Sequence, residues 1–321
     1  MKAVFIEQPG DAGALRYADF PKPEAASGQV LVKLAAAGVN FIDTYQRSGL
    51  YKIPLPAVLG MEGAGIVEAL GTNVGAFKVG DPVAWAMSRG SYAEYAAVPA
   101  QFLVKVPSGL DLRQAAAAML QGMTAHYLTH STFPIKPGHV ALVHAAAGGT
   151  GRLISQMVKL RGGRVIGTAG TPEKAEVARA AGADEVILYR EQDVVAEVKR
   201  FTDGKGVNVV YDGVGEATFM QSLDSLKPRG MMALFGQSSG PVKSFDPQLL
   251  NSKGSLFFTR PTLANYSSPD EIRWRSGDVL GWILSKKLDL LAERFYPLAD
   301  AAQAHRDLES RKTMGKLVLT I

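Results

Sequence analysis

The sequence has 321 residues, of which 47% are hydrophobic and 20% charged, as is usual for a globular protein of about two domains. Its 35 lysines and arginines are scattered among 30 acidic residues. The net charge of +5 therefore indicates a solvated surface rather than the basic face of a nucleic-acid-binding protein. The chain has no cysteine, which excludes disulfides, thiol nucleophiles and thiolate metal sites.

The N-terminus does not resemble a secretion signal. Its short apolar start reaches Glu7 too soon to form the core of a signal peptide. No apolar run is long enough to span a bilayer. We therefore expect a cytoplasmic protein.

The first 107 residues are rich in short strands broken by Gly, Pro and Asp, a pattern that favours a small barrel or sandwich. Residues 38–51 combine Asn, Asp, Arg and two tyrosines, and by themselves they suggest a loop and a short helix. In residues 60–65, closely spaced glycines indicate a tight approach of the backbone. Glu62 between them is either buried and paired or part of a turn between two strands. The expected strands lie at 29–34, 65–70, near 83–85 and at 91–98.

Helical spacing follows at 115–120, after a possible cap at Asp111, and again at 123–130. His126 and His130 stand four residues apart, which is the spacing of two metal ligands on one helix face. The glutamate of a zinc protease is absent and no third ligand is apparent, so a structural pair is the favoured interpretation.

From residue 139 onward, strand and helix patterns alternate, which implies a parallel sheet covered by helices. The nucleotide-binding form of this fold places a glycine turn after its first strand. The expected strands lie at 139–145, 164–168, 185–189, 207–212, 230–235 and 255–259. The expected helices lie at 150–161, 172–181, 191–202, 216–226 and 246–252.

The glycine turn is the run HAAAGGTG at residues 144–151, between an apolar strand and an amphipathic helix. It approximates the motif G-x-G-x-x-G, with alanine in the first position. Glycines allow the backbone to turn sharply, and the helix N-terminus offers N–H groups to an anion. The turn therefore predicts a pyrophosphate site; the alternative is that its glycines serve packing only. The residues concerned are Gly148, Gly149, Thr150 and Gly151.

After residue 262 the pattern changes to amphipathic helices and ends in a strand at 315–321. A terminal strand must pair with another strand, and the β-rich N-terminal part is the expected host. The nucleotide-binding domain is then inserted in a discontinuous first domain. The predicted division is 1–122, 123–262 and 263–321.

The end of the second strand of the alternating region indicates which nucleotide is bound. NAD enzymes commonly place an acid there for the ribose hydroxyl, whereas this sequence has none. Gly170 leaves room for a 2′-phosphate, and Lys174 could neutralise it at the start of the next helix. This pattern favours NADPH over NADH; the alternative is that Lys174 is an ordinary exposed lysine.

Taken together, these segments resemble the zinc-free quinone oxidoreductase (ζ-crystallin-like) branch of the medium-chain dehydrogenase/reductase superfamily. The resemblance covers essentially the whole chain. It implies a β-rich GroES-like catalytic domain and a Rossmann domain, NADPH in a cleft between them, and a homodimer formed through the last Rossmann strand near 255–258. The motifs that carry it are 39–45, 60–65, 143–151, 211–215, 235–240 and 308–311.

The resemblance also implies residue roles. Asn40 and Tyr45 would lie near the nicotinamide, and Gln237 would contact the cofactor on the same side. The turn at 148–151 would hold the pyrophosphate. The residues implied around the 2′-phosphate are Gly170, Lys174, Tyr189 and Arg311.

The zinc-dependent branch needs cysteine and histidine ligands, but this chain has no cysteine and carries Met61 at the histidine position. Without a Lewis acid, the acceptor should be intrinsically electrophilic, which fits a quinone. We therefore expect an NADPH-dependent quinone reductase that works without metal. The alternatives are an alkenal or enone reductase and a non-enzymatic NADPH- or RNA-binding protein. The candidate catalytic residues are Asn40, Tyr45, Arg47 and Tyr51. Tyr45 or Tyr51 could donate to the acceptor oxygen, and Arg47 could stabilise the developing charge.

Overall fold

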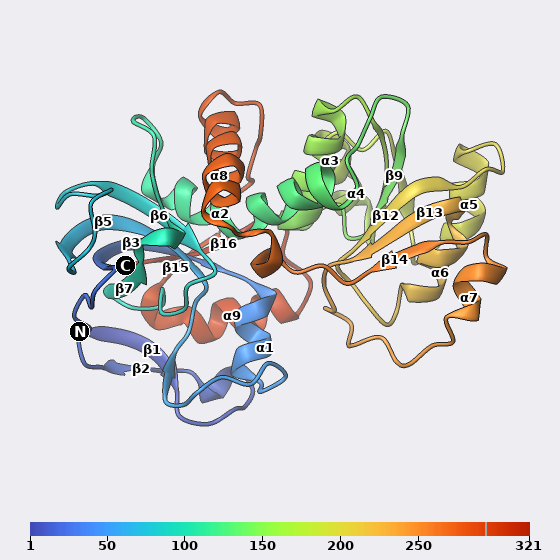
Figure 1. The fold of residues 1–321 in the computed structure, drawn as a ribbon. Helices are drawn as coiled ribbons and strands as arrows, with labels where there is room; N and C mark the ends of the chain where they lie inside the picture. Colours follow the sequence, from blue (N-terminus) through green and yellow to red (C-terminus); the bar gives the residue numbers. More distant parts are fainter. Residues whose placement is uncertain (293) are drawn as a thin grey trace. The chain divides into compact units, whose positions relative to one another are not determined.

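The computed structural model describes residues 1–292 and 294–321. The chain forms two compact units (Figure 1). Unit 1 comprises Met1–Met123 and Ser267–Ile321, and unit 2 is the continuous segment Thr124–Tyr266 inserted between them. The sequence-based division lies at 122/123 and 262/263.

Unit 1 is built on a seven-stranded sheet, in the order β15-β16-β3-β5-β6-β8 with β7 also paired to β3. A smaller sheet has the order β2-β1-β4. The strands are β1 (Lys2–Ile6), β2 (Arg16–Asp19), β3 (Gln29–Val39), β4 (Ala57–Val58), β5 (Glu62–Leu70), β6 (Pro82–Ala86), β7 (Tyr95–Pro99), β8 (Leu103–Lys105), β15 (Arg294–Pro297) and β16 (Leu317–Thr320).

The C-terminal strand β16 pairs antiparallel with β3, with Leu317 opposite Val39. This pairing confirms that the end of the chain returns to the N-terminal part. Alternate residues of β3, Val30, Val32 and Leu34, share one face of the strand and pack into a core with the buried Trp85. The glycine-rich stretch at 60–65 is largely strand β5, in which Glu62 is the first residue.

The helices of unit 1 include α1, the short helix expected within residues 38–51. The two helices expected at 115–120 and 123–130 form one helix, α2, followed by a π-helical turn, η3. Gly122 lies within α2 and does not break it. A side chain there would collide with Val279 of α8, so the glycine lets the two helices approach closely. The helices are α1 (Phe41–Arg47), α2 (Leu112–Tyr127), α8 (Pro269–Leu284) and α9 (Ala301–Glu309), and the 3₁₀ turns are η1 (Ala12–Ala14), η2 (Ala100–Phe102) and η5 (Leu298–Asp300). The last residues of α2, the turn η3 (Leu128–Thr132) and the 3₁₀ turn η4 (Leu263–Tyr266) belong to unit 2.

Unit 2 contains a six-stranded sheet, in the order β11-β10-β9-β12-β13-β14, in which every neighbouring pair is parallel. This is the usual Rossmann order, in which the first strand lies at the centre and the chain runs outward from it in two directions. The strands are β9 (Val140–Val143), β10 (Arg164–Ala169), β11 (Glu185–Leu188), β12 (Val207–Asp212), β13 (Leu226–Leu234) and β14 (Phe257–Thr259).

The helices of unit 2 alternate with these strands, as the sequence pattern predicts. Apolar residues of the strands form the core, among them Leu142, Ile166, Ile187 and Val210. The helices are α3 (Gly149–Leu160), α4 (Pro172–Ala180), α5 (Val194–Phe201), α6 (Phe219–Asp224) and α7 (Gln248–Ser252). In the part of the chain that the structure describes, no helix combines the length and the apolar character that crossing a bilayer requires.

Candidate functional site

The candidate cofactor residues of unit 2 follow the carboxyl ends of parallel strands. Gly148 follows β9, Gly170 follows β10 and Gln237 follows β13. Because the strands are parallel, these loops meet at one edge of the sheet. The chain changes direction between β9 and β12, and nucleotides bind at this edge beside such a switch point in folds of this kind.

The glycine turn has the geometry of an anion site. Ala145 has a positive φ of 51°, and its carbonyl oxygen accepts a hydrogen bond from Gly148 N at 2.8 Å. A side chain at Gly151 would overlap the same carbonyl oxygen, so only glycine allows α3 to start so close to the turn. No side chain caps α3 at Gly148. The partly exposed first turn therefore directs backbone N–H groups outward, where a pyrophosphate fits.

A buried network of polar side chains supports this turn on its inner side. His144 Nε2 lies 3.0 Å from Ser222 Oγ, and His144 Nδ1 lies 3.2 Å from Thr168 Oγ1. Ser222 donates its hydroxyl hydrogen to Asp212 at 2.8 Å, so it accepts from His144, and the hydrogen on the ring is at Nε2. Thr168 also accepts the backbone N–H of Ala145 at 3.2 Å.

Histidine, serine and aspartate in one network resemble a hydrolase triad, but their connections differ. Here the aspartate accepts from the serine rather than from the histidine, and all three side chains are buried. Burial lowers the pKa of His144, and the charge of Asp212 opposes this shift. The network therefore keeps a neutral histidine beneath the turn and has a structural role.

A second group of residues at this edge suits a phosphate. A side chain at Gly170 would lie 2.7 Å from Tyr189 Oη, so the absence of one leaves room beside the phenol. Thr171 caps α4 by accepting the backbone N–H of Lys174 at 3.4 Å. Burial, and then the charge of Arg190, lower the pKa of Lys174. A bound phosphate would oppose both effects, because its negative charge favours the protonated lysine.

No sequence motif singles out Arg190, although it directly follows Tyr189 just after β11. Two other expected cofactor residues lie in irregular segments. Gln237 lies in the loop after β13, where its carbonyl oxygen accepts Gly240 N at 2.9 Å. Arg311 is exposed just after α9 in unit 1, with a φ of 57°. Their contacts with NADPH stay predictions.

In unit 1, the candidate residues surround α1. Asn40 precedes this helix and is 3% exposed. Its side-chain oxygen accepts from Lys316 Nζ at 2.7 Å, and its side-chain nitrogen donates to Glu62 at 2.8 Å. Both ends of the amide are thus engaged inside the protein. The buried pairing of Glu62 confirms one of its two expected environments.

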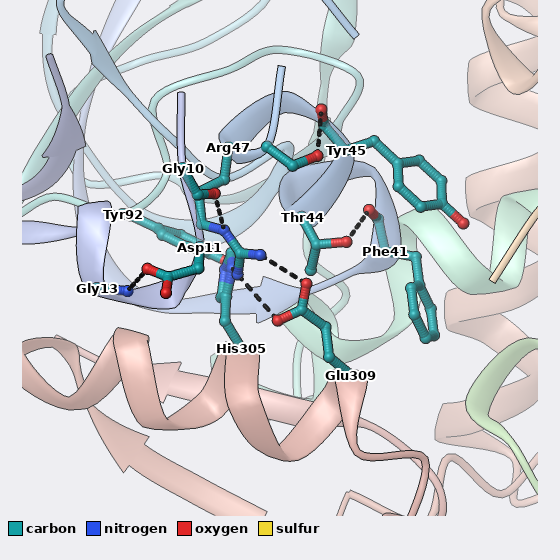
Figure 2. A network of polar contacts seen from close by, with 11 residues as sticks. Gly10, Asp11, Gly13, Phe41, Thr44, Tyr45, Arg47, Tyr92, His305 and Glu309 are labelled. Atoms are coloured by element: carbon teal, nitrogen blue, oxygen red, sulfur yellow. Dashed lines mark hydrogen bonds and ion pairs between the residues drawn. The ribbon is translucent and has the colours of Figure 1, made fainter. Parts of the chain in front are cut away.

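Aromatic side chains gather on one side of α1. The rings of Tyr45 and Tyr51 meet edge to face, with their centroids 5.3 Å apart, and Phe41 lies 6.1 Å from Tyr45. Tyr51 is 37% exposed. Figure 2 shows the rings of Tyr45 and Phe41 projecting from the helix on the side away from Arg47. These rings could stack against a flat acceptor.

The structure does not support the catalytic role predicted for Arg47. Its guanidinium is buried and binds Glu309 through both terminal nitrogens, while Nε donates to the carbonyl oxygen of Gly10 (Figure 2). The physical reason is the helical period. Residues two apart on a helix differ by about 200° in direction, so Arg47 and Tyr45 cannot point to the same side.

Arg47 belongs to a buried series of hydrogen-bonded side chains that no sequence motif predicts. Because arginine can only donate, His305 Nδ1 accepts from it at 3.1 Å, and His305 Nε2 donates to the oxygen of Tyr92 at 3.2 Å. The hydroxyl of Tyr92 donates to Asp43 Oδ2 at 3.0 Å, and the backbone N–H of Asn40 donates to the same oxygen. Asp43 Oδ1 is buried without a hydrogen-bond partner.

This environment shifts the pKa values of two groups. Burial raises the pKa of Asp43 to about 7, against the opposing effect of its hydrogen bonds. Burial, and then the charge of Arg47, lower the pKa of His305 to about 3. His305 is therefore neutral at physiological pH, whereas Asp43 exchanges a proton close to neutrality.

His126 and His130 stack face to face, with ring centroids 4.1 Å apart and planes inclined by 10°, which is a packing contact. Across residues 1–292 and 294–321, no group of three or more histidine and acidic side chains is arranged to hold a metal ion.

Two family models match the chain. Residues 26–108 match the alcohol dehydrogenase GroES-like domain, and residues 149–270 match the family described as zinc-binding dehydrogenase. These matches fall on the β-rich part of unit 1 and on the Rossmann sheet of unit 2.

Similar proteins extend over nearly the whole chain. A quinone oxidoreductase of Pseudomonas aeruginosa is 44% identical, covering 97% of this chain and 96% of that protein. A 2-haloacrylate reductase of a Burkholderia species is 42% identical, with 91% and 90% covered. The solved structure of Escherichia coli quinone oxidoreductase in complex with NADPH is 41% identical, with a TM-score of 0.98 and both chains fully covered. The chain therefore belongs to the quinone oxidoreductase branch of the medium-chain dehydrogenase/reductase superfamily.

Proposed function

We propose that this protein is an NADPH-dependent quinone reductase. The observation that carries the proposal is the uncapped start of α3 at the switch point of the sheet, where Gly151 closes against Ala145 and leaves backbone N–H groups for a pyrophosphate. Lys174 in the first turn of α4 and Arg190, which follows Tyr189, then favour the phosphorylated nucleotide. In this proposal residues 123–262 are the NADPH-binding part, and residues 1–122 and 263–321 are the catalytic part.

NADPH, when bound, supplies a hydride, and a quinone becomes a hydroquinone by taking that hydride and one proton. The residues of the protein bind the cofactor and the acceptor and orient them for transfer. Gly149 and Thr150 offer N–H groups to the pyrophosphate, and Gly148 shapes the turn through its bond to Ala145. Tyr45 and Tyr51 hold the flat acceptor, and one hydroxyl donates to its oxygen. Most of the rate enhancement comes from this orientation and from exclusion of water.

The remaining predicted cofactor residues complete the binding surface. Tyr189 joins Lys174 around the 2′-phosphate, and Gln237 contacts the cofactor. The roles of Arg311 at that phosphate and of Asn40 near the nicotinamide stay predictions from the family resemblance. Both ends of the Asn40 amide already have partners, so its role rests on its position at the start of α1.

The composition of the chain favours an activated acceptor. A simple ketone or alcohol needs a Lewis acid, and a chain without cysteine cannot supply the thiolate ligands of the zinc branch. A second candidate acceptor is an alkene conjugated to a carboxylate or carbonyl. The similarity to a 2-haloacrylate reductase supports that candidate, since it is nearly as high as the similarity to quinone oxidoreductases.

The test is oxidation of NADPH and NADH, measured in parallel with naphthoquinones and with enones. We expect turnover with NADPH and quinone, and a lower kcat/KM for NADH. A higher kcat/KM for enones would support the second candidate. Salt-dependent RNA binding without NADPH turnover would contradict an enzymatic function.

The two tyrosines have a matched control. Tyr45→Phe and Tyr51→Phe each remove one hydroxyl while keeping the ring, and the variant that carries the donor loses kcat. Tyr17→Phe, at an exposed position on β2, should leave kcat unchanged. Unchanged turnover of both tyrosine variants with every acceptor would remove a hydroxyl donor from the mechanism.

We also propose a homodimer formed through β14. This strand lies at the end of the sheet order, and Phe257 on it is 57% exposed. Such an edge pairs readily with the same strand of a second copy. Sedimentation of the parent and of Phe257→Lys tests this, with a monomeric variant expected. The cytoplasmic location stays a prediction.

A further inference from the structure

A buried ion pair of unit 1 links the segment before the C-terminal strand to the first residue of β5. Lys316, immediately before β16, is 1% exposed, and its ammonium lies 2.5 Å from Oε2 of Glu62, which is 0% exposed. The two residues are 254 positions apart. A lysine this deeply buried must be matched by acceptors, and Glu62 and Asn40 provide them.

The ion pair determines which way the amide of Asn40 points. An ammonium can only donate and a carboxylate can only accept, so the amide oxygen must face Lys316 and the amide nitrogen must face Glu62. A residue before a helix usually directs its side-chain oxygen toward the N–H groups of the first turn. Here the oxygen also serves the ion pair, because it accepts from Lys316 at 2.7 Å. A carboxylate from inside the helix, Asp43, accepts the backbone N–H of Asn40 at 2.8 Å, as in a capping box.

The surrounding backbone is shaped for this pair. A side chain at Gly38 would overlap the carboxylate of Glu62 and lie 2.8 Å from Cε of Lys316, so the glycine makes room for both. The second oxygen of Glu62 accepts the backbone N–H of Leu120 on α2 at 2.7 Å. The network thus joins β5, α2, the start of α1 and the residue just before β16.

We propose that Lys316 is a positioning residue of the reductase. Paired with Glu62, its ammonium fixes the amide of Asn40 at the start of α1 and so sets the position in which Tyr45, on that helix, meets the acceptor. This inference rests on the proposed function. Apolar side chains of similar volume can replace a buried ion pair without loss of stability, so stability alone does not account for these charges. The need to orient the amide of Asn40 accounts for them.

The test uses the full-length protein and three variants. Lys316→Met removes the charge and keeps the length, Lys316→Arg keeps the charge, and Glu62→Gln/Lys316→Met removes both charges at once. The double variant leaves no unpaired buried charge, so it folds even where the single variant does not. Lys2→Met, which breaks an exposed ion pair with Asp19, is the matched control.

Three quantities are measured: the Kd for NADPH from nucleotide fluorescence, the KM for a naphthoquinone, and kcat. In Lys316→Met and in the double variant we expect kcat to fall by roughly ten- to hundredfold, since small displacements at a reacting centre have effects of this size. The Kd for NADPH should stay within about twofold, because the glycine turn lies in unit 2 and its N–H groups are unchanged. Lys316→Arg should recover part of kcat, and Lys2→Met should match the parent.

The outcomes separate this inference from the proposed function. A double variant that is folded, binds NADPH and keeps the parental kcat would overturn the positioning role while leaving the reductase intact. An equal loss in Lys316→Met and Lys316→Arg would also overturn it, because the charge would then not matter. A parent that binds NADPH but reduces no quinone or enone would overturn the proposed function and this inference with it.

Discussion

Arg47 and Glu309 form a bidentate ion pair between α1 and α9, with nitrogen–oxygen distances of 2.6 and 3.1 Å. The pair is asymmetric, because the side chain of Arg47 is 4% exposed and that of Glu309 is 37% exposed. Water can therefore solvate the glutamate when its partner is lost, but it cannot reach the arginine. The pair anchors the helix that carries Tyr45.

We expect Glu309→Ala to destabilise the protein by about 2–3 kcal/mol, less than for a fully buried pair because water already screens this glutamate. Chemical denaturation of the variant and the parent measures this change. The same variant should reduce kcat, since α1 loses an anchor.

A double-mutant cycle with Arg47→Met tests the positioning role further. If Arg47 and Glu309 act as a unit, the effects of the two substitutions on kcat will be strongly non-additive. If Arg47 acts on the acceptor directly, Arg47→Met will reduce kcat while Glu309→Ala leaves it unchanged.

Asp43 and His305 give opposite pH dependences to stability. Asp43 has a folded pKa of about 7, above its ordinary 3.8, so the folded protein holds a proton that the unfolded chain releases as pH rises through this window. The stability contributed by protonated Asp43 is therefore lost as the pH rises from about 4 to 7. His305 has a folded pKa of about 3 against 6.5, so its contribution is lost as pH falls from 6.5 to 3.

Single substitutions should separate the two effects. Relative to the parent, the unfolding free energy of Asp43→Asn should rise with pH between pH 4 and 7, by up to about 1.4 kcal/mol per pH unit for one proton. That of His305→Gln should fall with pH, relative to the parent, between pH 3 and 6.5. Urea denaturation at half-unit pH steps measures both, with Asp19→Asn as an exposed control. Variant curves parallel to the parent curve would contradict the pKa shifts.

Gly151 and Gly148 should differ in their tolerance of a side chain. A Cβ atom at Gly151 would overlap the backbone oxygen of Ala145, whereas at Gly148 it would lie 3.2 Å from that oxygen. We expect Gly151→Ala to weaken NADPH binding at least tenfold, about 1.4 kcal/mol, and Gly148→Ala to have a smaller effect. Gly75→Ala, where a Cβ meets nothing within 4 Å, is the control. Equal Kd values for all three variants would argue against a pyrophosphate at this turn.

Lys174 and Arg190 should determine the preference between the two nucleotides. We expect Lys174→Ala and Arg190→Ala each to raise the Kd for NADPH by about tenfold and to leave the Kd for NADH unchanged, because each removes a charge-assisted contact to the 2′-phosphate. Arg164→Ala, at the opposite end of β10, is the control. The increase in the Kd for NADPH caused by either substitution should be smaller at high salt. A parallel change for NADH would contradict the assignment.

The sequence predicted the architecture of unit 2 because its signals are local. An apolar strand, a glycine turn and an amphipathic helix follow one another within residues 140–160, and each is encoded by its own residues. The return of the terminal strand to the N-terminal part was also predictable, since an unpaired strand needs a host. The absence of an acid at the end of the strand before Gly170 indicated the nucleotide by the same local logic.

The tertiary structure decided which side of α1 is buried and what each polar group meets there. The helical period alone separates Arg47 from Tyr45, but only the packing of α9 makes Arg47 the buried one. The partners of Asn40 and Arg47 lie 276 and 262 positions away along the chain. Hydrogen bonds and charges act over a few ångströms in space, so residues this distant in sequence interact only after strands and helices have packed.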